Sequence, residues 1–483
     1  MHTTSCFGTP IKVPAPACFI DLRTGFGSVI GDALKTGGMP GKLLLRYNSL
    51  HPTTTTTTIV IINCKNHGAK MVDFCGFSLP IQYAQQNIID SHNYVRKNCG
   101  IFDVSHMLQV RIHGADRLYF MESMTSSDLL NLPIGTGTLS VYLKDDGGIL
   151  DDLIINKCTE PYLYVVSNAA CAEKITSHLK MKQIEFSKSG KDATIEFLGR
   201  YALLAVQGPE SYNILRQNTV TEGQRILDNL YFMESSIIPS LFGLNDSSDP
   251  IRITRCGYTG EDGYEISVPA KLALELANRM METRRVKPVG LAARDTLRLE
   301  AGMCLYGNDL SESVTPVEAS LSWLVGKRRR QASSDPPIPG GKKILAQLKD
   351  KAQVSERRIG IAGGTGPQAR PGAKIFSDRI DGPVGRVTSG CLSPTLGRNI
   401  AMAYVKSEFT NPGENLHVEI RQKLYPFTVT SLPFVPNRYE PEMDVMSGLP
   451  VTIQPVVQIT THRVRLNQQL SNVRRAAVYL EKR

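Results

Sequence analysis

The sequence predicts an α+β protein in which mainly antiparallel sheets are covered by helices. Between residues 69 and 330, segments with the two-residue alternation of strands are followed repeatedly by segments with the 3.6-residue apolar spacing of helices. After a Pro-, Gly- and Ser-rich linker at 331–342, short strand-like runs follow at close spacing with turn residues between them. Such closely spaced strands are typical of a small β-barrel or sandwich.

Three strand-then-helix pairs support the first part of this prediction. In each pair an alternating apolar stretch precedes a stretch with helical spacing, and in the third a Gly-Pro pair opens the helix. The pairs are "LQVRIHG" with "ADRLYFMESM", "PYLYVVSN" with "AACAEKITSHLKMK", and "ALLAVQ" with "GPESYNILRQ".

Two adjacent carboxylates, Asp151 and Asp152, stand in the second strand of a hairpin predicted over 137–156. The hairpin turn is "DDGG", because Asp and Gly tolerate the positive φ of tight turns. By alternation Asp152 shares its face with Ile154 and Asn156, and Asp151 points to the other face. One interpretation is that one Asp faces water at a strand edge while the other caps a loop. The alternative is a carboxylate in a pocket, where burial raises its pKa and suits it to holding a proton near neutral pH.

Two further segments carry candidate binding groups. In "RCGYTGEDGYEISV" a Gly-rich turn separates two strand-like pieces, and Glu265 is either solvated or an acceptor for paired N–H donors of a planar heterocycle. In "GLAARDTLRLEAGMCLYGND" Arg294 and Arg298 stand one turn apart on a predicted helix. These arginines form either a surface salt-bridge face or a fork that reaches a carboxylate or planar ligand.

These patterns divide the chain into five parts. We expect an atypical N-terminal extension that is a transit peptide or disordered (1–67), a region of two α+β subdomains (68–330), a linker with a short helix (331–355), a β-barrel domain (356–441) and a C-terminal extension of unknown role (442–483).

Charge and motifs exclude several function classes. The formal net charge is +10, but residues 1–68 supply +4 and residues 442–483 supply +3, so the basicity belongs mainly to the ends and does not indicate a nucleic-acid partner. The ten cysteines include no C-x-x-C pair, which argues against structural zinc and favours a reducing compartment. "GFGSVIG" and "GGTGPQARPG" are weak nucleotide motifs, and His106 is expected to be a core or rim histidine and not a metal ligand. No stretch reaches the length needed to span a bilayer.

A set of motifs, in this order, resembles the aminomethyltransferase family, the T-proteins of glycine cleavage. The similar motifs are "GAKMVDFCGF", "FDVSHM", "GGILDDLI", "LYVVSNA", "AVQGP", "RCGYTGEDGYEISV", "GLAARDTLRLEAGMCLYGND", "LSWLVGKRRR", "TSGCLSPTLG" and "PFVP". The resemblance covers about residues 68–440. It implies a three-domain cloverleaf around a central folate cavity.

The resemblance also implies roles for residues. It places the catalytic carboxylate at Asp152 and the pterin-holding carboxylate at Glu265. The other expected folate contacts are Met107, Ile154, Asn156, Val166, Asn168, Tyr258, Arg294, Trp323 and Tyr439.

The activity implied is transfer of the methylene unit from an aminomethyl-lipoyl H-protein to tetrahydrofolate, with release of ammonia, in mitochondria. Tetrahydrofolate would be a substrate, other glycine cleavage components would be indirect partners, and we expect no metal, nucleotide, nucleic-acid or membrane ligand. A fixed carboxylate would stabilise the developing positive charge and manage a folate proton. The basic "GKRRR" run could attract an acidic lipoyl carrier or the polyglutamate tail of folate. The alternative is that it forms a solvated loop.

Alternatives remain within and outside this family. A folate-binding paralogue of the iron–sulfur maintenance type would use a reactive cysteine in a Lys-Gly-Cys-Tyr-like motif, which is absent here, and a dimethylglycine or sarcosine dehydrogenase would need a flavin domain. A non-catalytic interaction protein would bind through its basic ends with steep salt dependence. The chain also departs from the family pattern before "GAKMV" and at Phe77, where Trp is common.

Overall fold

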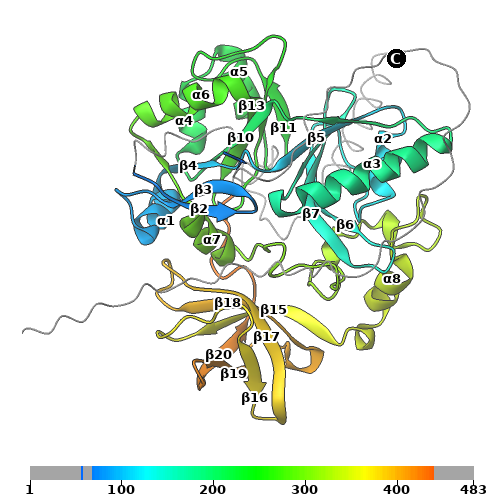
Figure 1. Ribbon diagram of the computed structural model, residues 1–483, viewed down its shortest axis with the longest axis vertical. Helices are drawn as coiled ribbons and strands as arrows, with labels where there is room; N and C mark the ends of the chain where they lie inside the picture. The colour runs from blue at the N-terminus through cyan, green and yellow to red at the C-terminus, as the bar shows by residue number, and fades with distance from the viewer. Residues whose placement is uncertain (1–55, 58–67, 440–483) are drawn as a thin grey trace, which may run out of the picture. The chain divides into compact units, whose positions relative to one another are not determined.

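The computed structural model describes residues 56–57 and 68–439 (Figure 1). Within these residues the chain forms three sheets and a closed six-stranded barrel. Most strand pairs are antiparallel, and the β1–β3 and β4–β14 pairs are parallel. The predicted α+β class with a C-terminal barrel is therefore confirmed.

The six-stranded sheet has the order β11-β12-β13-β10-β4-β14. Its strands are β4 (Cys99–Asp103), β10 (Tyr201–Gln207), β11 (Ser235–Ile238), β12 (Ile251–Thr254), β13 (Gly263–Pro269) and β14 (Val286–Pro288). One face is covered by α4 (Ser211–Gln217), α5 (Thr221–Asp228) and α6 (Ala270–Glu282). Tyr264, Ile266 and Val268 of β13 join these helices in one buried cluster, which leaves Glu265 and Ser267 on the other face, as predicted.

The five-stranded sheet has the order β6-β7-β8-β5-β9. Its strands are β5 (Leu108–His113), β6 (Gly137–Leu143), β7 (Ile149–Lys157), β8 (Leu163–Ser167) and β9 (Thr194–Phe197). The helices α2 (Arg117–Glu122) and α3 (Ala172–Lys188), with the 3-10 turn η1 (Ala169–Cys171) before α3, pack on one face with Val110, Leu153 and Val165. β6 and β7 form the predicted hairpin.

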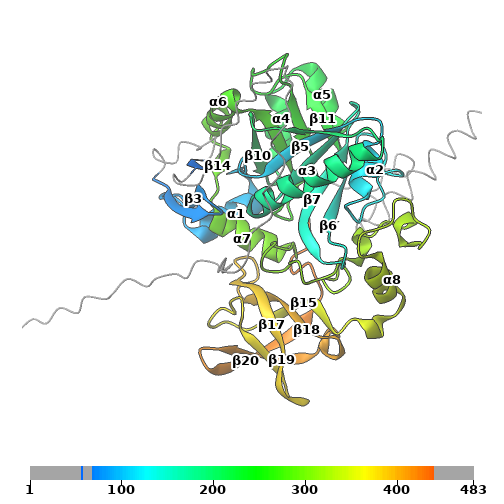
Figure 2. The ribbon, with the colours of Figure 1, turned by 45° about the vertical axis from the view of Figure 1, so that its right-hand side comes forward.

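The remaining faces of these two sheets share a buried cluster. Phe102, Val166 and Leu203 contribute to it from β4, β8 and β10, and Ala293 and Leu297 contribute from α7 (Leu291–Glu300). Helices thus lie on the outer faces, and the inner faces of the two sheets meet each other (Figure 1 and Figure 2). This inner space is where Asp152 and Glu265 are carried.

A small sheet and two helices flank this space. The sheet consists of β1 (Thr56–Thr57), β3 (Phe77–Gln82) and β2 (Lys70–Phe74) in that order. The helix α1 (Ile88–Lys97) begins after Asn87, whose side chain accepts a hydrogen bond from the Asp90 amide as an N-cap. Both α1 and β3 contact α7, so α7 is enclosed.

The C-terminal barrel follows a segment of short turns and one helix. The segment contains η2 (Ser322–Leu324), η3 (Arg328–Arg330), α8 (Gly341–Lys349) and η4 (Lys351–Gln353). The barrel has the closed order β15-β18-β17-β16-β19-β20. Its elements are β15 (Glu356–Gly363), β16 (Lys374–Ser377), β17 (Ile380–Leu392), β18 (Asn399–Lys406), η5 (Ser407–Phe409), β19 (Asn415–Ile420) and β20 (Lys423–Thr430).

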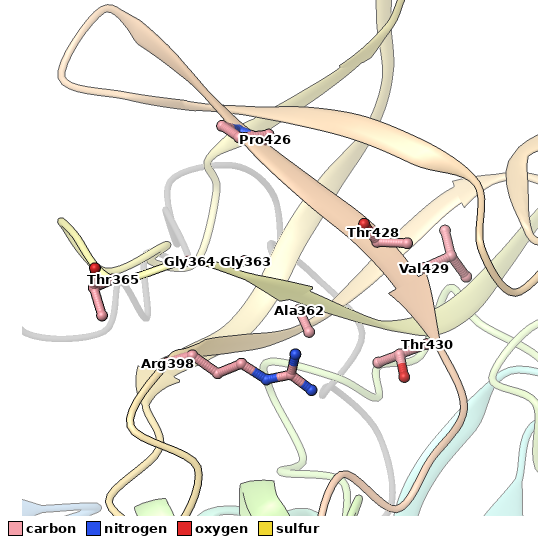
Figure 3. Close-up of a pocket in the computed structure, with 9 residues that line it drawn as sticks. All are labelled: Ala362, Gly363, Gly364, Thr365, Arg398, Pro426, Thr428, Val429 and Thr430. Carbon is pink, nitrogen blue, oxygen red and sulfur yellow. The ribbon is translucent and has the colours of Figure 1, made fainter.

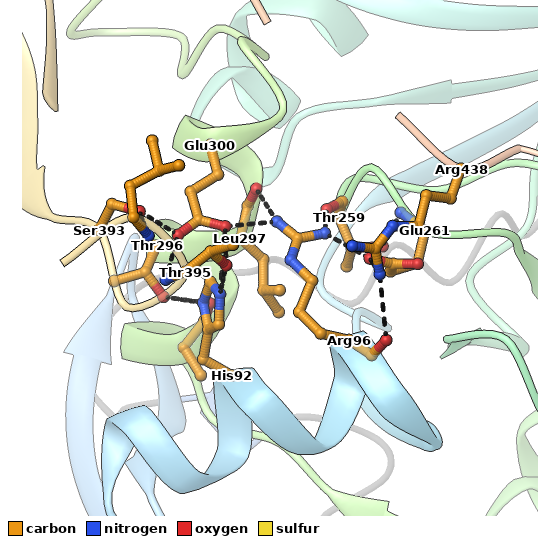
Figure 4. Close-up of polar contacts among 12 residues, drawn as sticks. His92, Arg96, Thr259, Glu261, Thr296, Leu297, Glu300, Ser393, Thr395 and Arg438 are labelled. Carbon is orange, nitrogen blue, oxygen red and sulfur yellow. Dashed lines mark hydrogen bonds and ion pairs between the residues drawn. The ribbon is translucent and has the colours of Figure 1, made fainter. Parts of the chain in front are cut away.

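A buried polar network centred on Glu300 joins α1, α7 and the barrel (Figure 4). Its fully buried carboxylate pairs with Arg96 Nη2 at 2.8 Å and His92 Nε2 at 3.2 Å, and it accepts bonds from Ser393 and from the Thr395 amide and hydroxyl. Burial acts to raise the pKa of Glu300, but these partners outweigh it and lower the pKa to about 2. Arg96 also pairs with Glu261, which ties the loop before β13 to α1.

Several predictions fall outside the described residues. These are the transit-peptide interpretation of 1–67 apart from β1, the glycine-rich stretch 25–31 and the extension 442–483. None of the described helices has the length and apolar character that crossing a bilayer requires. Six cysteines of the described part are not in disulfides: Cys99, Cys158, Cys171, Cys256, Cys304 and Cys391.

Candidate functional site

Two adjacent strands, β7 and β8, present one continuous face toward the six-stranded sheet. On β7 this face carries Asp152, Ile154 and Asn156. The register pairs Ile154 with Val166 and Asn156 with Tyr164 on β8. Leu153 and Ile155 lie on the opposite face in the core under α3. The alternation predicted from the sequence therefore holds along β7.

Asp151 and Asp152 differ in exposure and in partners. Asp151 is 0% exposed, and Asp152 is half-buried. Asn168 lies just beyond β8 and contacts both: its Nδ2 donates to Asp151 Oδ1 at 2.9 Å and to Asp152 Oδ1 at 2.8 Å. Burial raises the pKa of both aspartates, and the charge of Asp152 adds to the rise at Asp151. β7 lies between β6 and β8, so neither aspartate stands at a strand edge, and the strand-edge interpretation of this pair is wrong.

Glu265 reaches the same space from the second sheet. Its neighbour on the inner face of β13, Ser267, donates a 2.7 Å hydrogen bond to Gln109 Oε1, which also accepts from the Tyr164 hydroxyl at 2.8 Å. This contact joins β13 to β5 and β8. Glu265 is half-buried, and burial raises its pKa although Arg294 and the Cys256 thiol lower it. The expected pterin-holding carboxylate therefore lies at the junction of the two sheets.

Arg294 and Tyr258 lie together on the α7 side of the site. The Arg294 guanidinium is 4.9 Å from the centre of the Tyr258 ring, and the Tyr258 hydroxyl donates to the Cys304 carbonyl. Burial lowers the pKa of Arg294, and the charge of Glu265 opposes this effect. Among the described residues, no carboxylate forms an ion pair with Arg294. Burial also raises the pKa of Tyr258, with the charge of Asp152 among the causes.

The remaining predicted folate contacts, Met107, Tyr439 and Trp323, lie in three different surroundings. Met107 packs half-buried on the cluster that contains Val166. Tyr439 stacks on Phe232 at 4.1 Å between ring centres, and its buried hydroxyl has no hydrogen-bond partner among the described residues. Trp323 packs instead on a cluster with Val141 of β6, and no hydrogen bond joins it to the other predicted residues in the described part of the chain.

Two residues near the site were not predicted to belong to it. Gln109 links the two sheets, but a glutamine in an alternating strand carries no sequence signal for such a contact. His106 is buried, as expected for a core histidine, with its Nδ1 atom unpartnered within the described structure. Burial and the charge of Arg294 lower the pKa of His106 to about 3, so the ring is neutral near pH 7.

The three arginines of "GKRRR" form contacts within the protein. Arg328 pairs with Glu122 and with Asp128, and the fully buried Arg329 pairs with Glu122 at 3.1 Å. Arg330 donates to two backbone carbonyls. Intramolecular acceptors use all three guanidinium groups, while Lys327 and Arg330 remain exposed, so both interpretations of the run stay predictions.

An open hollow of about 670 Å³ lies on the barrel between the ends of β15 and β20 (Figure 3). None of its lining residues belongs to the predicted site. They are Ala362, Gly363, Gly364, Thr365, Arg398, Pro426, Thr428, Val429 and Thr430. A smaller hollow beside β14 likewise contains no predicted site residue. The candidate site is therefore defined by the convergence of side chains between the sheets. Within the described ranges, no group of three His, Cys, Asp or Glu side chains could hold a metal ion.

Two family models match the chain. The model described as the GCVT N-terminal domain matches residues 62–329. The model described as the glycine cleavage T-protein C-terminal barrel domain matches residues 357–436. Together they cover the two sheets, the helices between them and the barrel.

Named relatives and a solved structure are also similar to the chain over most of its length. "Aminomethyltransferase, mitochondrial" from Gallus gallus is 45% identical over 402 residues, which are 83% of this chain and 98% of the relative. The Homo sapiens protein of that name is 47% identical over 374 residues, 77% of this chain and 88% of the relative. The crystal structure of glycine cleavage system aminomethyltransferase T from Bartonella henselae has a TM-score of 0.71 and 33% identity, and the match covers 80% of this chain and 99% of that chain.

Proposed function

The chain belongs to the glycine cleavage T-protein family, and from this membership we propose that its two facing sheets hold tetrahydrofolate beside Asp152 while a methylene unit arrives from a lipoylated H-protein. The activity is that of an aminomethyltransferase, a one-carbon transferase of glycine cleavage, and the compartment is the mitochondrion. We propose tetrahydrofolate as the acceptor, the H-protein as the partner, and specific roles for residues of the two sheets.

The polar groups of the site fit a planar heterocycle that carries N–H donors and a charged tail. Glu265 offers two acceptor oxygens for a bidentate contact. Arg294 has no carboxylate partner in the described structure, and the Tyr439 hydroxyl and Asn156 Oδ1 are buried without hydrogen-bond partners there. Unpartnered buried polar atoms are uncommon, so a ligand that pairs with them is a physical explanation for their presence.

The observation that carries the proposal is the state of Asp152. Asn168 Nδ2 donates to Asp152 Oδ1, and apart from the backbone amide of Asp152 itself no other described residue is a hydrogen-bond donor to this carboxylate. Burial raises its pKa, because the charged form is poorly solvated between the sheets. Bound tetrahydrofolate would supply the two nitrogens that accept the one-carbon unit. Asp152 would stabilise positive charge as it develops there and hold or release a proton, and low solvation strengthens such electrostatic help.

The second candidate, a paralogue that uses a reactive cysteine, finds no support among the buried cysteines near the site. A nucleophilic cysteine needs a lowered pKa. Burial instead raises the pKa of Cys158 to about 11 and that of Cys391 to about 12, and it raises that of Cys256, the cysteine beside Glu265. These thiols are neutral near pH 7, which favours the aspartate-based reaction.

The test is a direct assay with purified protein. Aminomethylated H-protein and tetrahydrofolate are mixed with the protein, and ammonia and methylenetetrahydrofolate are followed together. We expect the two products in equal amounts. Ammonia release without methylenetetrahydrofolate, or no dependence on tetrahydrofolate, would contradict the proposal.

A further inference from the structure

Asp151 is fully buried, yet both of its oxygens are used by a single residue. Its Oδ1 accepts from Asn168 Nδ2 at 2.9 Å, and its Oδ2 accepts from the Asn168 backbone amide at 3.0 Å. The Cys171 thiol is a further neighbour that hydrogen-bonds to the carboxylate. Among the described residues, no Lys, Arg or His forms an ion pair with Asp151. Asn168 is therefore its principal partner.

The Asn168 side chain stands between the two aspartates and has only one workable orientation. A carboxylate only accepts hydrogen bonds, so the amide nitrogen must face both acids. The same Nδ2 atom donates to Asp152 Oδ1 at 2.8 Å and lies 3.2 Å from the Asp152 carbonyl. The amide oxygen of Asn168 consequently points away from the carboxylates.

We propose that Asp151 is a positioning residue, which clamps the backbone and side chain of Asn168 so that Asn168 fixes the rotamer of Asp152 for the reaction. This inference rests on the proposed function. Asp151 itself does not reach the ligand space, because it is 0% exposed and its side chain lies on the core side of β7. It acts only through Asn168.

The geometry explains why a carboxylate is needed at this position. Both hydrogen bonds from Asn168 to Asp151 use an N–H donor. An amide at position 151 has one oxygen and one NH2 group, so in either orientation it sets its NH2 group against one of those donors. Asp151→Asn therefore keeps the size of the side chain but removes one of the two hydrogen bonds from Asn168 to residue 151. Asn168 would then be free to turn, and Asp152 would lose its fixed geometry.

The burial of the Asp151 carboxylate destabilises the fold, and a purely structural role does not explain why it is there. A carboxylate removed from water destabilises the fold unless its partners compensate, and the nearby negative charge of Asp152 adds to that cost. A purely structural role could be filled by a neutral or apolar side chain. Retention of two acceptor oxygens at this position is explained if they hold the residue that orients Asp152.

The experiment measures the turnover rate at saturating substrates, tetrahydrofolate affinity and thermal unfolding for five proteins besides the wild type: Asp151→Asn, Asp152→Asn, the double variant, Asn168→Ala and Cys171→Ala. We expect Asp151→Asn to lose about tenfold in turnover while tetrahydrofolate affinity stays within about twofold. In the Asp152→Asn background the same change should cost at most about twofold more, because its effect passes through Asp152. Cys171→Ala, which touches Asp151 without disturbing Asn168, should stay close to wild type.

The outcomes separate this inference from the proposed function. If the wild-type protein transfers no methylene unit, both the proposed function and the positioning role of Asp151 are wrong. An active wild type in which the Asp151 and Asp152 losses multiply, or in which Cys171→Ala matches Asp151→Asn, overturns the positioning role alone. If Asp151→Asn does not fold, Asn168→Ala takes its place. A loss of turnover at saturating tetrahydrofolate that is small in the Asp152→Asn background supports the clamp, and wild-type turnover refutes it.

Discussion

A carboxylate taken out of water loses hydration that hydrogen bonds must replace, and Asp151 and Asp152 replace it to different extents. Both oxygens of Asp151 accept bonds from Asn168, whereas only one oxygen of Asp152 does so. A half-buried acid with fewer hydrogen bonds at the edge of a ligand space can respond to a substrate. A fully satisfied acid in the core can only hold its neighbours. This difference assigns the chemistry to Asp152.

The first prediction concerns the charge of Asp152. Asp152→Asn keeps the size and one acceptor of the side chain but removes the negative charge that would stabilise the developing cation. We expect turnover to fall by about 10²–10⁴, the range for positioned acid–base groups, with tetrahydrofolate binding largely retained. Steady-state turnover and equilibrium binding measured on the same protein check this. A loss no larger than that of Asp151→Asn would contradict the assignment.

The second prediction concerns the charge state of Glu265. Burial raises the pKa of Glu265 above its ordinary value of 4.5, so its neutral form appears at higher pH than for a solvated glutamate. If the carboxylate form binds the pterin, tetrahydrofolate affinity is full above this raised pKa and is lost as pH falls through it.

Glu265→Gln should weaken tetrahydrofolate binding about tenfold to a hundredfold at neutral pH, the value of a lost charge-assisted contact. It should also flatten the pH dependence, while Ser267→Ala, one step along the same face of β13, keeps the wild-type slope. Binding titrations from about pH 8 to pH 5 test this. An unchanged slope in Glu265→Gln would assign the titration to another group.

At the scale of the elements, side-chain direction was predictable and inter-element contacts were not. Alternation fixes which face of β7 carries Asp152, and which face of β13 carries Glu265, because the side-chain period of a strand is two. The bridge from Asn168 to both aspartates depends on where β8 ends relative to β7. The Gln109 contact depends on how two sheets pack, and the internal pairing of Arg328 and Arg329 depends on acids some 200 positions away. Local sequence patterns do not show which residues so far apart in the chain come into contact.

The helix α7 provides the third prediction, through Glu300 at its last turn. The pKa of Glu300 is lowered from 4.5 to about 2 in the folded protein. A depressed folded pKa means that the stabilisation is complete above pH 4.5 and is lost as pH falls toward 2.

Glu300→Gln should therefore lower the free energy of unfolding by about 3 kcal/mol at neutral pH, and it should weaken the acid dependence below that range. The control is Glu275→Gln, which removes only a half-exposed pair with Arg279 on α6 and should cost less than about 0.5 kcal/mol. Denaturant unfolding of both variants measures these values. Equal costs would show that the buried network contributes nothing beyond a surface pair.

At the scale of the whole described structure, the barrel is joined to the sheets by buried polar groups as well as by apolar packing. Glu300 bonds to Ser393 and Thr395 of the loop between β17 and β18. Asp309, also fully buried, pairs with Arg298 of α7 at 2.8 Å and accepts from the hydroxyls of β17. Both contacts originate on α7, which also carries Arg294 toward the site. The barrel therefore supports the helix that supplies a predicted folate contact.

The last prediction tests whether this support is cooperative. Asp309 accepts hydrogen bonds from Thr388 at 2.6 Å and Ser389 at 2.8 Å on β17, so Asp309→Asn leaves the buried charge of Arg298 with less compensation and loosens the barrel contact. Breaking a buried pair of this kind costs about 3–5 kcal/mol, which corresponds to a fall in Tm of roughly 5 °C for a protein of this size. Asp378→Asn, at a largely exposed barrel position beside His417, should leave Tm unchanged. Calorimetry distinguishes the cases: if the barrel and α7 unfold together, the wild type gives one transition for both and Asp309→Asn broadens or splits it. A wild-type Tm in Asp309→Asn would mean that the barrel is held by its apolar contacts alone, and Arg294 would then owe its position to the sheets and not to the barrel.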